Sequence, residues 1–274
     1  MARITKDKTA VAAIDPLNHL DLAFIVDTTG SMGPFIDAAR QHTVATLRRL
    51  TSDSARPVDL RTAVVEYRDH PPQDMSFVTR EYGFTNELPE VQKVIAKLKP
   101  DGGGDMPEAV LDGIHSSCRS LEWRPYSRRT AILIGDAPPH GWRGQTPHGA
   151  CACGETVDSA TAVLEQQRIV LYAVGLTSAA DASFMWLARA TGGSYVAAHR
   201  GHDAIDALEA LLAREFAELD FDSRVRDGHR KYPEATVDEL AAVLDSLPGR
   251  VAVSLSRLGR RGLLAMEPAA SAVH

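Results

Sequence analysis

Long hydrophobic runs are missing from this sequence. No segment reaches the ~18 apolar residues that a membrane-spanning helix requires. The apolar stretch at 11–14, near the start, is too short for the core of a signal peptide. A basic stripe is missing too, and the formal net charge is -6, whereas binding nucleic-acid phosphates needs a basic surface. We therefore expect neither a membrane nor a nucleic acid among the partners.

Cysteine is also scarce. The three cysteines leave at least one thiol unpaired within the chain. Such a set fits a reducing compartment better than it fits a disulfide framework. We therefore expect a cytoplasmic protein.

The length and the placement of charge indicate one main domain with an appendage. The 274 residues, 44% of them hydrophobic, can bury one sizeable core. The acidic excess lies entirely in residues 1–218, which hold 28 acidic and 22 basic residues, whereas residues 219–274 hold eight of each. We predict an N-terminal arm at 1–19, a main domain at 20–217 and a C-terminal extension at 218–274. An acidic main domain suits a cation site.

Strand and helix patterns alternate regularly along the main domain. Short apolar, β-branched runs predict strands at 22–26, 58–67, 130–134, 169–174 and 194–198, with an edge strand within 75–85. Helical spacing of apolar residues predicts helices at 34–50, 87–98, 107–121, 157–167, 180–190 and 203–216. This alternation predicts an α/β fold, a doubly wound and mostly parallel sheet with helices on both faces.

The extension has a different pattern. Residues 220–232 are strongly polar and read as a linker, and 236–247 predicts a helix that opens with a capping box from Thr236 to Glu239. Residues 251–255 alternate weakly as a strand, and 268–274 read as a disordered end. The three arginines within 257–261 favour a solvated helix or strand end.

One turn carries the most informative polar residues of the chain. Asp27, Thr29 and Ser31 follow directly after the predicted strand 22–26, and Gly30 and Gly33 indicate a sharp turn there. Residues two apart in an extended turn face the same side, so one carboxylate and two hydroxyls can converge on one point. Oxygen donors of this kind suit Mg²⁺ or Mn²⁺.

The Asp27-x-Thr29-x-Ser31 pattern resembles the first loop of the metal-ion-dependent adhesion site (MIDAS) of von Willebrand factor A domains. Two further loops resemble the rest of that site. In the second loop, 102–108, Asp105 takes the place where most members of the family have threonine, and Gly104 is the alternative register. In the third loop, Asp136 matches the last acidic residue of the family's site. With the sequence from Tyr67 to His70, the loops look most like A domains joined to α-kinases and their bacterial relatives.

The resemblance spans about residues 20–217 and implies a Rossmann-like fold. It also implies Mg²⁺, or Mn²⁺ or Ca²⁺, at the carboxyl rim of the sheet, bound by Asp27, Thr29, Ser31, Asp105 and Asp136. A protein partner that presents Asp or Glu to the cation would bind there. Because Asp105 adds a third carboxylate, we expect tighter cation binding and weaker capture of a partner carboxylate than in adhesion-type members.

Other polar residues belong to the same predicted rim. Asp69 and His70 follow a strand and either support the cation site or form a solvated turn. Glu108 reads as a favourable acid in the first turn of its helix rather than as a ligand. Trp142, near His140, is either an exposed anchor for a partner or a loop tryptophan folded onto its own domain.

The long loop 137–154 carries a second cluster, made of His140, His148, Cys151 and Cys153. Imidazole and thiolate are zinc ligands, so the cluster predicts a possible Zn²⁺ site apart from the rim. Free surface thiols and a strained redox pair of Cys151 with Cys153 are the alternatives.

Three functions compete. The first is a noncatalytic, metal-dependent interaction module that binds a protein at the rim. The second is a phosphotransfer enzyme, because 27–31 also resembles the nucleophile loop of haloacid-dehalogenase-like proteins, with Asp27 as nucleophile. That chemistry needs a further acidic residue shortly after Asp136, where the chain has Pro138 and Pro139. The third is a structural domain that interacts through the helix at 236–247. The sequence leaves the oligomeric state open.

Overall fold

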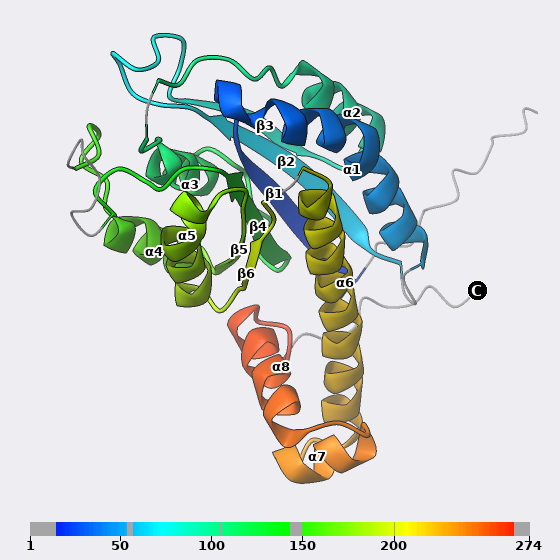
Figure 1. Ribbon diagram of the computed structural model, residues 1–274. Helices are drawn as coiled ribbons and strands as arrows, with labels where there is room; N and C mark the ends of the chain where they lie inside the picture. The colour runs from blue at the N-terminus through cyan, green and yellow to red at the C-terminus, as the bar shows by residue number, and fades with distance from the viewer. Residues whose placement is uncertain (1–14, 54–56, 105, 143–149, 200, 266–274) are drawn as a thin grey trace, which may run out of the picture.

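A six-stranded sheet forms the centre of the molecule. The structure is a computed structural model that describes residues 15–53, 57–104, 106–142, 150–199 and 201–265. The strand order is β3-β2-β1-β4-β5-β6 (Figure 1). Five strands run parallel, and β3 pairs antiparallel with β2 at one edge. The strands are β1 (His19–Asp27), β2 (Asp59–Tyr67), β3 (Thr79–Thr85), β4 (Arg128–Gly135), β5 (Ile169–Gly175) and β6 (Tyr195–Ala197).

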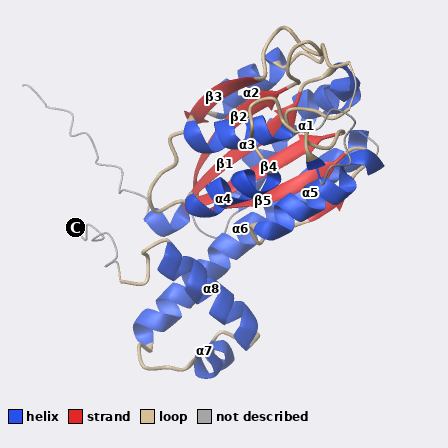
Figure 2. Cartoon of the chain, turned by 90° about the vertical axis from the view of Figure 1, so that its left-hand side faces the viewer, coloured by secondary structure: helices blue, strands red, loops and turns tan. Residues whose placement is uncertain are grey.

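Helices cover both faces of the sheet (Figure 2). One face packs against α1 (Gly33–Asp53), α2 (Leu88–Lys97) and α6 (Gly201–Lys231), and the other against α3 (Val110–Arg119), α4 (Val157–Gln166) and α5 (Ser178–Ala190). Successive side chains of β1 enter opposite cores, so Phe24 lies in the first and Ile25 in the second. Central parallel strands are buried on both faces, which explains the continuous apolar run in β1. The predicted doubly wound α/β fold is confirmed.

The strand register brings three loops to one edge of the sheet. Asp27, the last residue of β1, is paired with Tyr67, the last residue of β2. On the other side of β1, Val26 is paired with Ile134 of β4. The chain segments that follow β1, β2 and β4 therefore leave the sheet together, at the carboxyl rim where open α/β sheets bind ligands.

The prediction of a polar linker at 220–232 is wrong. Helix α6 continues to Lys231 and crosses the boundary that we expected at 217. Its apolar side chains pass from one core to another: Phe216 and Leu219 pack under the sheet, and Phe221 and Val225 pack in a separate C-terminal core. The polar residues of this segment therefore belong to a helix with two partners.

The strand predicted at 251–255 is also wrong. This segment lies inside α8 (Pro248–Arg260), which has proline at its first position and buries Val251, Ser254 and Leu258 at helical spacing. The helix expected at 236–247 is shorter, α7 (Val237–Val243), with the predicted capping box. After it, Asp245 has a positive φ of 48° and helps to turn the chain toward α8.

The extension is joined to the main domain by apolar packing and buried ion pairs. Helices α7 and α8 pack along the second half of α6 (Figures 1 and 2). Leu17, within the expected N-terminal arm, is fully buried in the same core. Leu17 is the middle residue of the short 3-10 helix η1 (Pro16–Asn18). Residues 15–19 are therefore part of the fold, whereas 1–14 and the end predicted to be disordered lie outside the described residues.

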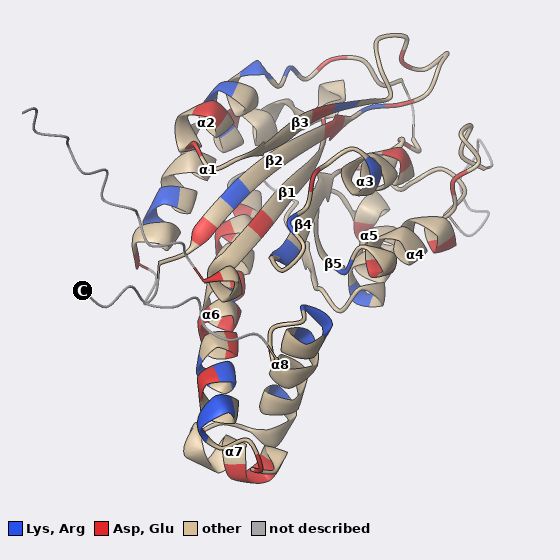
Figure 3. Cartoon of the chain, turned by 180° about the vertical axis from the view of Figure 1, so that it is seen from behind, with Lys and Arg blue, Asp and Glu red and all other residues tan. Residues whose placement is uncertain are grey.

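Helix α6 carries both acidic and basic residues, whereas the charged residues of α8 are all arginines (Figure 3). Arg128 of β4 binds both carboxylate oxygens of Glu215, at 2.6 and 2.9 Å, and lies 3.3 Å from Asp222. Asp222 in turn pairs with Arg257 of α8. Arg257 and Arg261 are thus mostly buried partners of the α6 carboxylates, which corrects the expectation of a solvated end. Among the described residues, no helix has the length and apolar character needed to cross a bilayer.

Candidate metal centre

The first rim loop gathers three oxygen-bearing side chains. The backbone N–H and the hydroxyl of Thr29 both donate to Asp27 Oδ1, at 2.8 and 2.7 Å. The Thr29 hydroxyl lies 3.3 Å from the hydroxyl of Ser31, which is exposed. Ser31 belongs to the short 3-10 helix η2 (Gly30–Met32) that turns the chain into α1. The structure therefore brings Asp27, Thr29 and Ser31 together.

Within the described part of the chain, the second oxygen of Asp27 has no hydrogen-bond partner. Asp27 is fully buried, and its Oδ2 contacts no donor among the described residues. Burial, followed by the charge of Asp136, raises the pKa of Asp27 to about 7. Asp136 is half-buried, one residue beyond β4. A buried carboxylate is costly unless it is paired or coordinates a metal, so this pair of acids fits a divalent cation.

The second loop lies against the first through its backbone. Gly30 N donates to Gly102 O at 3.1 Å, and Asp101 N donates to Thr28 O at 3.1 Å. Gly102 and Gly103 have positive φ values of 70° and 71°. A Cβ added to Gly103 would lie 3.0 Å from the Thr29 side chain, so this close approach requires glycine. Asp105 lies outside the described residues, and its role as a ligand stays a prediction.

Arg68 connects the rim loops through hydrogen bonds and an ion pair. Its Nη2 donates to Lys99 O at 2.8 Å and its Nε to the Thr28 hydroxyl at 3.3 Å. Its Nη1 lies 3.4 Å from Asp74, which is also buried. One guanidinium thus joins three chain segments, a geometry that its planar fork of donors favours.

Asp69 and His140 form a buried pair. Asp69 Oδ1 lies 2.6 Å from His140 Nε2 and accepts the His70 backbone N–H at 2.7 Å. Asp69 is fully buried, so the alternative of a solvated turn does not hold for it. Its Oδ2 has no partner among the described residues. The pairing joins the loop after β2 to the loop after β4.

Glu108 lies before α3, which corrects the expectation that it lies in the first turn of that helix. The helix α3 starts two residues later, and the Glu108 side chain is buried. Its backbone N–H donates to Pro138 O at 3.0 Å, and its Oε1 lies 3.3 Å from where a Cβ on Gly103 would be. Glu108 therefore connects the second and third loops at the rim.

Trp142 is 6% exposed and packs edge-on against Trp186, with ring centroids 6.2 Å apart. Of the two alternatives, the structure favours a tryptophan folded onto its own domain.

Tyr67 is a rim residue that the sequence analysis missed. Its side chain is fully buried, and its hydroxyl, without a partner among the described residues, lies against Gly135. Burial, together with the charges of Asp27, Asp136 and Glu108, raises the pKa of Tyr67 well above its ordinary value. Its position at the end of a strand was the available signal, but an inward-facing tyrosine reads as core.

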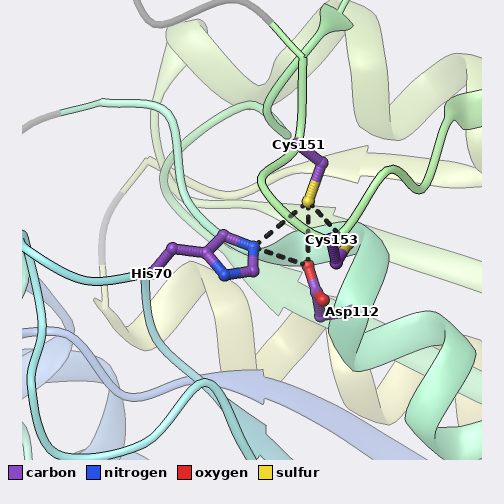
Figure 4. Close-up of side chains that lie close together, drawn as sticks. All are labelled: His70, Asp112, Cys151 and Cys153. Atoms are coloured by element: carbon purple, nitrogen blue, oxygen red, sulfur yellow. Dashed lines mark hydrogen bonds and ion pairs between the residues drawn. The ribbon is translucent and has the colours of Figure 1, made fainter.

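A second polar cluster lies beside the rim and differs from the predicted zinc set. Its members are His70, Asp112, Cys151 and Cys153, and their potential ligand atoms all lie within 4.8 Å of one another (Figure 4). His140 is instead the partner of Asp69, and His148 lies outside the described residues. Burial, followed by the hydrogen bond with Cys153 and the Asp112 charge, raises the pKa of the Cys151 thiol. Cys151 and Cys153 are free thiols in this structure and do not form a disulfide bond.

The fold and the rim loops are those of doubly wound α/β domains, whose ligand sites lie at the carboxyl ends of a parallel sheet. Residues 21–139 match the sequence model of the von Willebrand factor A domain family. This part of the chain is a von Willebrand factor A domain, and the resemblance inferred from the three loops is confirmed.

Two relatives by sequence carry the matching segment within much longer chains. The α-protein kinase vwkA of Dictyostelium discoideum is 32% identical over 134 residues, which are 49% of this chain and 21% of the kinase. An ariadne-like RING finger protein, R811, of Acanthamoeba polyphaga mimivirus is 27% identical over 121 residues, 44% of this chain and 11% of that protein. The matches thus span about a fifth or less of these relatives.

Solved structures of low sequence identity share the fold. Proximal thread matrix protein 1 from the mussel byssus, in a structure described as having a zinc-occupied MIDAS motif, has a TM-score of 0.54 and 15% identity. That match covers 74% of this chain and 47% of the mussel chain. The pilus adhesin SpaC of Lactobacillus rhamnosus GG, in its open conformation, has a TM-score of 0.54 and 13% identity, covering 73% and 30%. The haloacid-dehalogenase alternative is not supported by these matches.

Proposed function

We propose that the chain is a noncatalytic interaction module that binds a partner protein through a divalent cation at the carboxyl rim. Asp27, Thr29, Ser31 and Asp136 are the described ligands in this proposal, and Asp105 is the ligand taken from the sequence. The observation that carries it is the buried Asp27 carboxylate, whose Oδ2 has no donor among the described residues while a second acid lies beside it. A buried carboxylate is either neutralised by a proton or compensated by a cation, and a bound cation would keep Asp27 in its charged form.

The donor set points to the kind of metal. Carboxylate and hydroxyl oxygens suit hard cations, so we propose Mg²⁺, with Mn²⁺ or Ca²⁺ as substitutes. When bound, the cation would supply an open coordination position for a carboxylate of the partner. Thr29 orients Asp27, Asp136 contributes the second charge, and the Gly102–Gly103 backbone keeps the neighbouring loop close to Thr29.

The comparisons support this proposal without identifying the partner. The MIDAS of one structural neighbour is described as zinc-occupied, and another neighbour is a pilus adhesin. A cytoplasmic location belongs to the same proposal. It is supported by Cys118, Cys151 and Cys153, which are all free of disulfide bonds, as expected in a reducing compartment.

The test compares the wild-type chain with Asp27→Asn. Mg²⁺ binding is measured by calorimetry, and proteins captured from a lysate are compared with and without a chelator. We expect the substitution and the chelator each to abolish capture. The matched control is Asp37→Asn, because Asp37 is an exposed acid on α1 that pairs with Arg40, and it should behave as wild type.

Two outcomes would contradict the proposal. Capture of the same proteins by Asp27→Asn, or in the presence of chelator, would show that the rim cation is not needed. Asp27-dependent hydrolysis of acetyl phosphate with Mg²⁺ would instead favour the phosphotransfer alternative, in which Asp27 is the nucleophile.

A further inference from the structure

We propose that His70, Asp112, Cys151 and Cys153 form a second metal site that takes Zn²⁺, separate from the cation site at the rim. The four side chains come from three parts of the chain. His70 follows β2, Asp112 lies in the first turn of α3, and both cysteines lie in the turn before α4 (Figure 4). This inference goes beyond the proposed interaction function and does not depend on it.

The ligand atoms already lie close to the spacing of a tetrahedral site. His70 Nε2 is 3.1 Å from both Asp112 Oδ2 and Cys151 Sγ, and Cys151 Sγ is 3.1 Å from Asp112 Oδ2. The two sulfurs are 2.9 Å apart. Tetrahedral zinc with its usual bond lengths sets its ligand atoms roughly 3.3 to 3.8 Å apart. The four pairs in contact therefore need to separate by less than about 1 Å, and the remaining pairs, which lie within 4.8 Å, need to approach by no more than about 1.5 Å, to admit the ion.

The types of ligand select zinc over the hard cations of the rim. Two thiolates, one imidazole and one carboxylate form a complete set of four protein ligands, as in structural zinc sites. Mg²⁺ and Ca²⁺ prefer oxygen ligands, and sulfur ligands disfavour them. His70 and Cys151 are buried, whereas Cys153 is exposed, so the site has one side open for the ion to enter.

Contacts around the cluster hold the cysteine turn in place. Three residues on one face of α3, Asp112, His115 and Arg119, are spaced for the same side of a helix and contact the segment 151–155. His115 and Arg119 bind Glu155, at 2.7 and 3.0 Å. The Glu155 backbone N–H donates to Cys153 Sγ at 3.4 Å, the kind of outer contact that orients a thiolate ligand.

A Zn²⁺ ion here would join the loop after β2 to α3 and to the segment before α4. The loop after β2 also carries Asp69, whose pairing with His140 belongs to the rim. The second site would therefore fix a wall of the first without sharing a ligand with it. Its role in this proposal is that of a structural cross-link.

The experiment uses the full chain, prepared metal-free under reducing conditions and then supplied with Zn²⁺, or with Co²⁺ as a spectroscopic substitute. Excess Mg²⁺ is present to occupy the rim. We expect one Zn²⁺ per chain and, with Co²⁺, a thiolate charge-transfer band together with the intense visible bands of tetrahedral cobalt. Since loss of an outer contact alone costs about 10- to 100-fold in affinity, Asp112→Asn and Cys153→Ser should each lose at least about 100-fold.

Two control variants separate this site from other possibilities. Cys118→Ser changes the third cysteine, which is buried within α3 and outside the cluster, and should keep the metal and the band. Asp27→Asn removes the rim site and should also keep both. Cys153 is exposed, so its substitution tests the site without disturbing the core.

Three results would overturn the proposal. One is Co²⁺ bound without a thiolate band. Another is Zn²⁺ lost by Asp27→Asn but kept by Cys153→Ser, which would assign the ion to the rim. The third is a Cys151–Cys153 disulfide that persists in reducing buffer, which would leave no thiolates to bind the ion. The first two outcomes leave the rim function to be judged by its own test.

Discussion

Thr29 donates two hydrogen bonds to the same oxygen of Asp27, one from its backbone and one from its hydroxyl. A hydroxyl has one proton and two lone pairs, so a Thr29 hydroxyl that donates to Asp27 directs its lone pairs elsewhere. The exposed Ser31 hydroxyl lies on that side, 3.3 Å away. Thr29 thus orients the carboxylate, and in the proposed site its hydroxyl would present an acceptor to the cation.

We expect Thr29→Val to weaken Mg²⁺ binding by at least about tenfold, because valine keeps the shape but removes both roles of the hydroxyl. Calorimetric titration of the cation measures the change. Thr43→Val, at a buried threonine of α1, is the matched control and should bind as wild type. Equal affinities for the Thr29 variant and the control would remove Thr29 from the site.

The acidic second loop gives a different prediction. In the register predicted from the sequence, in preference to the one that places Gly104 there, Asp105 takes the position where most members of the family have threonine. A third carboxylate should then strengthen cation binding while reducing the charge left to attract a partner. We expect Asp105→Thr to bind Mg²⁺ more weakly and to capture an Asp- or Glu-bearing partner more strongly. Mg²⁺ titration tests the first effect and capture in saturating Mg²⁺ the second. An unchanged Mg²⁺ affinity in Asp105→Thr would contradict the prediction that Asp105 strengthens cation binding.

The buried pair of Arg128 and Glu215 predicts a pH dependence of stability. Burial alone would raise the pKa of Glu215, but the Arg128 charge and hydrogen bonds lower it from 4.5 to about 2. A carboxyl whose pKa is lower in the folded than in the unfolded protein stabilises the fold at pH values above its unfolded pKa. This stabilisation is lost as the pH falls from about 4.5 toward 2. The loss should be about 3 kcal/mol.

Chemical denaturation at a series of acidic pH values measures this effect. Glu215→Gln should reduce the free energy of unfolding by up to about 3 to 5 kcal/mol near neutral pH, because it leaves the buried Arg128 with Asp222 as its remaining carboxylate partner. In the same variant, the free energy of unfolding should depend less strongly on pH in the acidic range. Glu209→Gln, at an exposed glutamate on the same helix, is the control and should retain it. An acid dependence unchanged in Glu215→Gln would assign the effect to other carboxylates.

The rim was predictable because its signals are local. Asp27, Thr29 and Ser31 lie within five residues, directly after an apolar run, and the topology of a parallel sheet then brings the loops after β2 and β4 to the same edge. Spacing and strand direction indicated the first loop, and the resemblance to von Willebrand factor A domains indicated the other two. The exposure of Trp142 could not be predicted in this way, because it depends on contact with Trp186, 44 positions away in the sequence.

The second metal cluster was only half predictable. Cys151 and Cys153 are adjacent enough to be noticed, but their partners depend on tertiary packing. Asp112 reads as a solvated acid on an amphipathic helix, and His70 reads as a turn residue, since no periodicity links either of them to the cysteines. The sequence therefore indicates His140 and His148, the nearest histidines along the chain, as zinc ligands. In the structure, His140 pairs with Asp69 instead.

The extension shows how a short pattern misleads. Five residues that alternate can belong to a strand or to a helix, because a window of this length does not separate a period of 2.0 from one of about 3.6. In a strand, Val251 and Val253 would face the same side. In α8, Val251 is fully buried and Val253 is 55% exposed.

Two identical substitutions distinguish these registers. Val251→Ala should reduce the free energy of unfolding by about 1.5 to 3 kcal/mol, because it removes buried methyl groups from the C-terminal core. Val253→Ala should change it by less than about 0.5 kcal/mol, since the side chain is on the surface and alanine favours helix. Urea denaturation of both variants measures the difference. Equal losses would contradict the helical register, and with it the packing of α8 against α6 that anchors the extension to the domain.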